Sequence, residues 1–409
     1  MTSYIALPKN DLTGSSGSSP GVSDQRLPSL TGLRFAAALL VFGFHIQAMH
    51  VFRADSAGER VVGHLFGHGA VGVSFFFILS GFVLTWSARA GERARRIWRR
   101  RAAKIYPNHL VTAAIAIAGL LALPAAADAG SSRLAGVLPN LLLLQAWDPN
   151  PAVYFGLNTV SWSLSCEALF YFCFPFLLRL LSRVGERALW PLAAGLAAIV
   201  WCLPLATFGS SSATSYWLIY VFPPARLAEF CLGMVLARIV RVGRWPRIPA
   251  WAAAVLLVAA YIAVGYVPTR FGYVAVTVIP LALLVPALAT ADVHGRGSLW
   301  SRRRAVWLGE VSFAFYLIHQ LVIRYTLKVL SKTIGDPGTW STARSVQVAV
   351  GMAVMSLLAA WALYRVVEQP LNRRLRGTRA RPKSQVDDNA AVPAVGVVGR
   401  RNLPLNGER

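Results

Sequence analysis

The stretch Gly69-Ala-Val-Gly-Val-Ser-Phe-Phe-Phe-Ile-Leu-Ser-Gly-Phe-Val-Leu-Thr-Trp-Ser-Ala88 contains twenty residues and no charged side chain. An α-helix of this length is about 30 Å long, which matches the hydrocarbon core of a bilayer. A backbone in lipid has no water to hydrogen-bond, so a long uncharged segment of this kind is typical of a transmembrane helix.

The same pattern recurs along the whole chain. Of its 409 residues, 56% are hydrophobic and 14% charged, whereas soluble domains average about 25% charged. We therefore predict an all-α, polytopic membrane protein with about ten transmembrane helices. The apolar windows are 30–50, 69–88, 104–124, 159–181, 188–207, 216–240, 250–267, 271–290, 308–330 and 345–367. A shorter apolar segment, 134–147, is expected to be interfacial or re-entrant.

The distribution of basic residues predicts the orientation of the chain. If the first window runs from the cytosol outward, the four inner loops hold 19 lysines and arginines and the outer loops hold six. This asymmetry is the positive-inside pattern, and it places both termini in the cytosol. The net charge of +24 therefore orients the protein in a membrane, and no nucleic-acid partner is expected.

The two ends of the chain differ from its centre. Residues 1–26 are polar and low in complexity, and residues 373–409 are basic, so both are expected to be disordered. Between them lies one transmembrane domain, 27–372, with no linker long enough to divide it. No metal site is expected, because the four cysteines lie inside apolar windows without metal-binding spacing.

A few ionisable residues interrupt the apolar windows. Each costs several kcal/mol in a bilayer unless it is paired or hydrated, so each is a candidate functional residue. Arg34 and His45 are eleven residues apart, so they share one helix face and are separated by about 16 Å along the axis. Arg34 lies near the cytosolic end, where a side chain reaching back to the interface is the alternative interpretation.

Other windows carry ionisable residues at a depth similar to that of His45. Counted from the predicted helix ends, Glu167, Arg226 and His319 lie within a few residues of one level. We expect these residues to line a cavity shared with His45. For Arg226 the alternative is a self-contained ion pair with Glu229, three residues along the same helix.

The segment 89–104 is more basic than topology alone requires. It contains eight arginines and lysines and one acid, Glu92. Clustered cations bind phosphates through charge-assisted hydrogen bonds, but anionic lipid headgroups are an equally good interpretation of this segment alone. Histidine suits a general base near neutral pH. The segment and the buried histidines together predict a phosphate-rich cytosolic cofactor whose reactive end reaches a buried base.

Seven motifs, in order over the ten windows, resemble the acyltransferase-3 family of bacterial integral-membrane O-acyltransferases. The resemblance covers about residues 27–372. The motifs are Leu30-Thr-Gly-Leu-Arg34-Phe-Ala-Ala followed by His45, Gly72-Val-Ser-Phe-Phe-Phe-Ile-Leu-Ser-Gly-Phe82, Arg101-Ala-Ala-Lys104-Ile-Tyr-Pro107, Ser161-Trp-Ser163-Leu-Ser165-Cys-Glu167 with Phe170-Tyr171, Arg226-Leu-Ala-Glu229-Phe-Cys-Leu-Gly233, Tyr316-Leu-Ile-His319 and Glu368-Gln-Pro370.

The resemblance implies an enzyme of the bacterial cytoplasmic membrane. Such an enzyme moves an acyl group, expected here to be acetyl from acetyl-CoA, to a hydroxyl of a sugar, glycan or polyketide-type acceptor. Many relatives carry a C-terminal esterase-like domain, and this chain is expected to resemble the compact members without one, which acylate glycans or macrolides.

The resemblance also implies roles for particular residues. The family's essential arginine and histidine of the first helix match Arg34 and His45. Arg34, Arg101 and Lys104 would hold the CoA phosphates, with Lys104 at a position where the family usually has a second arginine. His45 would act as the general base, and Glu167 and His319 would orient it or assist proton movement. The expected supporting polar residues are Ser163, Ser165, Arg226 and Glu229.

From the residues alone, a second class of function stays open. A multi-pass transporter or flippase could use the same buried charges as a substrate or proton path. The chain shows no internal repeat, which counts against inverted-repeat transporter folds. An enzyme of the predicted kind transfers acyl groups in detergent without a gradient, whereas transport requires two compartments.

Overall fold

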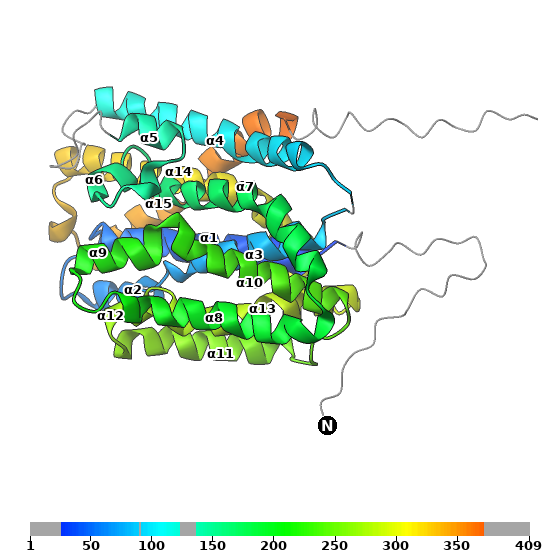
Figure 1. Ribbon diagram of the computed structural model, residues 1–409. Helices are drawn as coiled ribbons and strands as arrows, with labels where there is room; N and C mark the ends of the chain where they lie inside the picture. Colours follow the sequence, from blue (N-terminus) through cyan, green and yellow to red (C-terminus); the bar gives the residue numbers. More distant parts are fainter. Residues whose placement is uncertain (1–25, 90, 123–135, 372–409) are drawn as a thin grey trace, which may run out of the picture.

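A computed structural model describes residues 26–89, 91–122 and 136–371, and within these ranges the chain forms helices and no β-strand. Figure 1 shows the longer helices lying side by side in one bundle, with most axes running in the same direction. The predicted all-α class is confirmed. The predicted tails, 1–26 and 373–409, lie outside the described residues apart from Arg26.

Within the described ranges, nine segments are long and apolar enough to cross a membrane. They are Pro28–Ala48, Ala57–Trp86, Ala94–Ala122, Thr159–Arg183, Glu186–Ala206, Ser212–Arg241, Thr269–Val293, Arg303–Thr333 and Thr342–Leu371. A tenth apolar helix, Ala250–Tyr266, is shorter. Each of these ten segments overlaps one predicted window, so the prediction of a multi-pass membrane protein is confirmed.

The α-helices are numbered in chain order. They are α1 Pro28–Ala48, α2 Ala57–Phe66, α3 Val71–Trp86, α4 Ala94–Ala122, α5 Val137–Leu141, α6 Pro151–Tyr154, α7 Trp162–Arg183, α8 Leu189–Ala206, α9 Ser212–Tyr216, α10 Pro223–Arg241, α11 Ala250–Ala263, α12 Thr269–Gly272, α13 Ala275–Val293, α14 Arg303–Thr333 and α15 Thr342–Leu363. Two π-helical turns, Trp217–Val221 and Tyr364–Glu368, lie before α10 and after α15.

The basic segment is helical, which corrects the prediction of an inner loop over 89–104. Helix α4 begins at Ala94, so its first turns carry the arginines. Arginine, alanine and lysine are strong helix formers, which explains this early start. The ring nitrogen of Trp98 donates a hydrogen bond to the backbone oxygen of Tyr171 at 3.1 Å and attaches these turns to α7.

The connection between the first two windows, predicted to lie outside, contains a helix that the hydropathy pattern did not predict. Helix α2 is capped by Ser56, whose hydroxyl accepts a hydrogen bond from the backbone N–H of Glu59 at 3.0 Å. The spacing Ser-x-x-Glu is a known sequence signature of a helix start, so this helix could have been identified from the sequence.

The short apolar segment predicted over 134–147 is described from Gly136 onward. It forms α5 and a single 3₁₀ turn, Gln145–Trp147, neither of which is long enough to span a bilayer. Asn140 and Gln145 are fully buried, while Leu138 and Leu142 are exposed. A short segment with buried polar side chains and exposed apolar side chains fits the predicted interfacial or re-entrant position.

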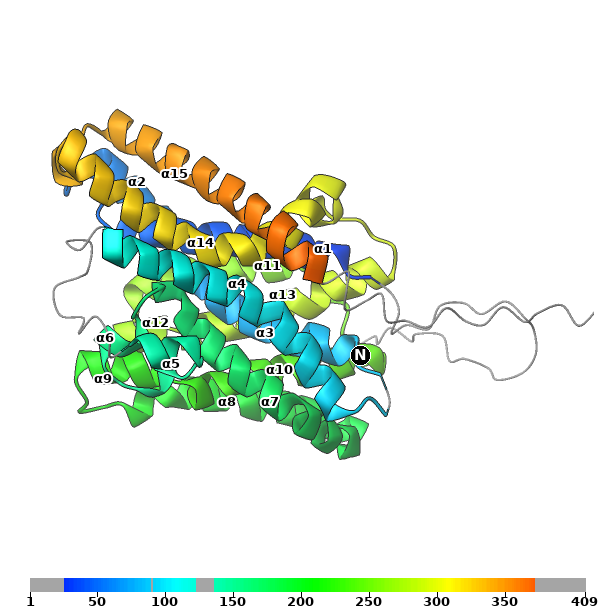
Figure 2. The ribbon, with the colours of Figure 1, turned by 90° about the horizontal axis from the view of Figure 1, so that it is seen from above.

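Close backbone approach holds α1 against α14, and Figure 2 shows the two helices running together along the bundle. A Cβ atom on Gly309 of α14 would overlap the backbone oxygen of Thr31 on α1. In a bilayer, where burial of apolar surface drives helix association little, small residues that permit such contact stabilise helix pairs. This contact sets how the residues of α1 lie against those of α14.

The predicted orientation can be tested at two exposed residues. Ser211 lies between α8 and α9, and Arg296 lies between α13 and α14, connections at opposite ends of the bundle (Figure 1). In a cysteine-free background, we expect Ser211→Cys to react with a membrane-impermeant thiol reagent in intact cells and Arg296→Cys to react only after permeabilisation. The reverse labelling would contradict the charge-based orientation and a cytosolic donor.

Candidate functional site

Two histidines from different helices meet inside the bundle. His45 lies in the last turn of α1 and His319 near the middle of α14. Nε2 of His319 is 3.1 Å from Nδ1 of His45, and the ring centroids are 5.0 Å apart. His319 is fully buried, and the ring of Phe315 stacks on it. The structure therefore brings together two residues that are 274 positions apart in the sequence.

Backbone carbonyls assign the protons of this pair. Nδ1 of His45 is 2.8 Å from the oxygen of Val41, and Nδ1 of His319 is 3.1 Å from the oxygen of Phe315. A carbonyl oxygen only accepts hydrogen bonds, so both rings carry their proton on Nδ1 when neutral. Nε2 of His45 then carries a lone pair and no proton. The Nδ1–H of His45 can donate a bifurcated hydrogen bond to the oxygen of Val41 and to Nε2 of His319.

Three cations from α1 and α4 form a second group. Lys104 lies within electrostatic range of Arg34 and Arg101, and of the carboxylates of Glu167 and Glu368. None of the three cations is within ion-pair distance of a carboxylate in the described ranges. The three side chains are partly buried. Three neighbouring cations without a direct ion pair in the described ranges are a candidate site for an anion.

Each carboxylate of this group is held by a neutral partner. The hydroxyl of Tyr171 donates to Glu167 at 3.1 Å, and the side-chain amide of Asn108 donates to Glu368 at 3.0 Å. Glu167 makes no hydrogen bond to either histidine within the described residues. The structure therefore groups Glu167 with the cations, and a role for it in orienting His45 stays a prediction.

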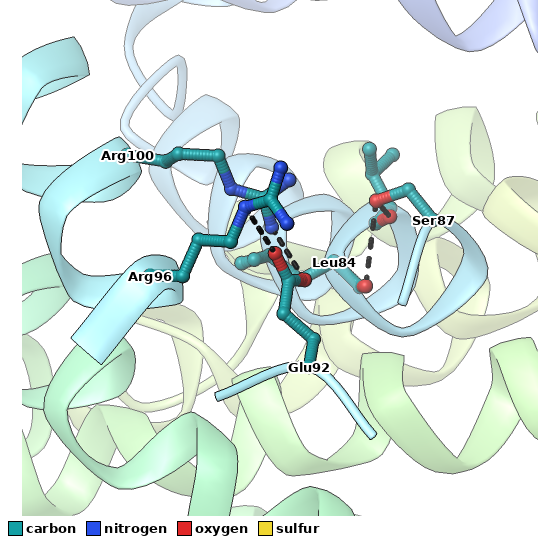
Figure 3. Close-up of polar contacts among 6 residues, drawn as sticks. Leu84, Ser87, Glu92, Arg96 and Arg100 are labelled. Atoms are coloured by element: carbon teal, nitrogen blue, oxygen red, sulfur yellow. Dashed lines mark hydrogen bonds and ion pairs between the residues drawn. The ribbon is translucent and has the colours of Figure 1, made fainter. Parts of the chain in front are cut away.

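The remaining basic residues of α4 point away from this group. Figure 3 shows Arg96 and Arg100 converging on Glu92, with nitrogen–oxygen distances of 3.7 and 2.6 Å. Both arginines are exposed. On a neighbouring face of the helix, Arg101 and Lys104 follow the buried Ile97 at helical spacing, and both are partly buried. The basic segment thus divides into an outer face and an inner, cation-bearing face.

Arg226 and Glu229 form a buried ion pair at the start of α10. Their side chains are 2.9 Å apart, and each residue is 1% exposed. The guanidinium also donates to the hydroxyl of Ser74 at 3.0 Å and lies 5.0 Å from the ring centroid of Phe77. These contacts fit the interpretation of a self-contained pair that joins α10 to α3.

The two serines of α7 connect the site to its surroundings. Ser163 is hydrogen-bonded to the hydroxyl of Tyr316 at 2.9 Å, and Tyr316 precedes His319 by one turn of α14. Ser165 donates to the side-chain oxygen of Gln145 at 2.9 Å. One serine therefore supports the helix that carries His319, and the other anchors the short segment before α6.

Sequence reasoning missed the site roles of Asn108, Tyr171 and Glu368. Tyr171 and Glu368 stood inside quoted motifs, but apolar neighbours gave no sign of what their side chains contact. Asn108 follows Lys104 by one helical turn and lies on the same inner face, which was the available signal. In the described ranges, no group of three or more His, Cys, Asp or Glu side chains is placed to hold a metal ion.

The fold is a polytopic helical bundle with a histidine pair toward one end of α1 and, toward the other end, three cations that form no direct ion pair in the described ranges. Residues 27–365 match the family model described as an acyltransferase domain. The chain belongs to this acyltransferase-3 family and is an integral-membrane acyltransferase.

Three relatives agree with this assignment. The chain is 43% identical over 378 residues to the acyltransferase MdmB of Streptomyces mycarofaciens, covering 90% of this chain and 97% of that protein. It is 26% identical over 338 residues to the exopolysaccharide production protein ExoZ of Rhizobium meliloti, covering 79% and 95%.

The third is the peptidoglycan O-acetyltransferase OatA of Listeria monocytogenes, 23% identical over 382 residues, which cover 86% of this chain and 56% of OatA. None of the three is named as a transporter, so the transporter or flippase alternative gains no support. No solved structure matches the chain.

The buried ion pair of α10 can be tested for a structural role. Arg226→Leu should destabilise the protein by about 3–5 kcal/mol, because it leaves Glu229 as an uncompensated buried charge. The double change Arg226→Leu with Glu229→Leu removes both charges and should recover most of that loss. Thermal unfolding of purified protein in detergent measures the stability of the single and the double variant. A double variant as unstable as the single one would contradict the interpretation of a self-contained pair.

Proposed function

We propose that the protein transfers an acyl group, most simply acetyl, from acyl-CoA to a hydroxyl of a sugar, glycan or polyketide-type acceptor in the bacterial cytoplasmic membrane. The observation that carries this proposal is the arrangement on α1. Arg34 lies in the cation group near one end of the helix, and His45 lies in the histidine pair near the other. A long cofactor with phosphates at one end and a thioester at the other suits this arrangement.

The cation group supports a CoA-type donor. Arg34 and Arg101 present planar guanidinium groups that suit bidentate contact with phosphate, and Lys104 adds a compact charge. The buried Nε of Arg101 has no hydrogen-bond acceptor in the described ranges, so it is available to donate to a phosphate. Lipid headgroups suit the exposed arginines of α4 better, because those face outward.

The histidine pair supports acyl transfer by general-base catalysis. The acceptor hydroxyl gives its proton to the free Nε2 of His45 as its oxygen attacks the thioester carbonyl carbon. The resulting imidazolium is stabilised through Nδ1, whose hydrogen is shared between the oxygen of Val41 and Nε2 of His319. The C–S bond then breaks, and the imidazolium returns its proton to the CoA thiolate.

The relatives' names support the acceptor class. One relative is a peptidoglycan O-acetyltransferase and another is an exopolysaccharide production protein. Both names concern carbohydrate polymers, and one specifies an acetyl group on oxygen. The acyltransferase at 43% identity names no acceptor, so a polyketide-type hydroxyl stays within the proposal.

The donor site predicts a specific change in kinetics. Arg34→Ala, Arg101→Ala and Lys104→Ala should each raise the KM for acetyl-CoA, most at Arg34, while kcat changes less. Added salt should also weaken donor binding, because ions screen partly exposed charges over about 10 Å at 0.1 M. Arg96→Ala is the matched control, since it removes an outward arginine of the same helix. If the KM for acetyl-CoA is the same as in the wild type for all four variants, the lipid-headgroup interpretation of this segment is favoured.

The identity of the base predicts the largest loss of activity. His45→Ala should lower kcat for release of the CoA thiol from acetyl-CoA by at least about 100-fold, because a positioned general base contributes about 10²–10⁴-fold. The KM for acetyl-CoA should change little, since the phosphates would bind near the other end of α1. His319→Ala should lower kcat less, because His45 keeps its hydrogen bond to the backbone oxygen of Val41. Purified, monodisperse His45→Ala protein with near wild-type activity would exclude this mechanism.

A further inference from the structure

The π-helical turn after α15 brings one particular carboxylate into the protein. The buried residues near the end of α15, Ser356, Ala360 and Leu363, follow α-helical spacing. Continued α-helix would place residue 367 on the buried face. The π turn Tyr364–Glu368 adds one residue to the turn, and Glu368 is buried while Val367 is only partly buried. Turns of this kind are frequent at functional sites.

Glu368 is buried close to the cations but does not contact them. The residue is 8% exposed, and one oxygen accepts the hydrogen bond from Asn108. Its charge acts on Lys104 and Arg34 through space, yet it forms no ion pair with either within the described residues. Asn108 lies one turn after Lys104 on α4. The amide therefore holds the carboxylate near the cations and out of direct contact with them.

We propose that Glu368 is an internal counter-ion of the donor site, a positioning residue that limits how tightly the site retains CoA. This inference rests on the proposed CoA donor and concerns the same site. Three neighbouring cations without a close anion repel one another, and a carboxylate nearby reduces that repulsion while the site holds no phosphate. Because Asn108 engages the carboxylate, the cations stay free for the phosphates.

The need for such a residue follows from the reaction. Acyl-CoA and the product CoA carry the same phosphates, so contacts to phosphate bind substrate and product alike and do not accelerate the chemical step. A site with three cations and no internal anion would hold the product strongly and slow its release. A fixed negative charge weakens binding of both ligands without removing any cation.

Two substitutions should act in opposite directions on CoA binding. Glu368→Gln keeps the shape and removes the charge, so it should lower the Kd for CoA about tenfold, the effect of one unit charge about 10 Å away at an effective dielectric constant of about 20. Asn108→Ala frees the carboxylate to pair directly with Lys104 or Arg34, so it should raise the Kd severalfold. Isothermal titration of CoA into the purified full-length protein in detergent measures both.

Glu310→Gln is the matched control. Glu310 is exposed and accepts a hydrogen bond from Tyr364 at 3.3 Å, and its charge lies within electrostatic range of Glu368. Because water screens an exposed charge, this variant should change the Kd for CoA by less than about twofold. An effect as large as that of Glu368→Gln would show that overall charge, and not the position of Glu368, governs binding.

The outcomes distinguish failure of the counter-ion role of Glu368 from failure of the proposed CoA donor. Weaker CoA binding in both Glu368→Gln and Asn108→Ala would indicate a purely structural hydrogen bond and overturn the counter-ion role. A Kd unchanged in Glu368→Gln would overturn it too, while leaving the CoA donor intact. Wild-type protein that does not bind CoA would reject the proposed donor itself. If Glu368→Gln does not fold, tighter or unchanged CoA binding by Asn108→Ala alone contradicts the inference.

Discussion

The close packing of α1 against α14 is the contact on which the site depends. Without a side chain at Gly309, the two backbones approach closely near the starts of both helices. The helices then stay together for the length of α1, and His45 reaches His319 near its far end. Because bilayer helices associate through packing more than through burial of apolar surface, a small residue at the crossing has large consequences for the groups beyond it.

The bilayer also explains how the buried charges are distributed. An ion within the membrane is costly unless it is paired, and Arg226 with Glu229 follows that rule. The group of Arg34, Arg101 and Lys104 departs from it, because its cations have electrostatic neighbours but no direct ion pair in the described ranges. This departure is what makes the group the candidate site for an anionic ligand.

The separation of the two groups has a chemical meaning. Phosphates and a reacting thioester need opposite surroundings, since one requires concentrated positive charge and the other requires a neutral base with a free lone pair. A cation next to His45 would disfavour its protonated form and weaken it as a base. Placing the groups near the two ends of one helix keeps them apart, while the rigid helix fixes their distance.

The sequence alone was sufficient for the class of fold, because hydrophobic length is a local property that each window carries by itself. It also selected Arg34, His45 and His319 as candidate functional residues, since an ionisable residue in an apolar helix is conspicuous without any partner. The sequence does not predict which of these side chains contact one another, because those contacts depend on how distant helices pack. Only the tertiary structure joined His45 to His319 and placed Glu167 with the cations. Only the π turn, which shifts the buried face by one residue, decided that Glu368 points inward.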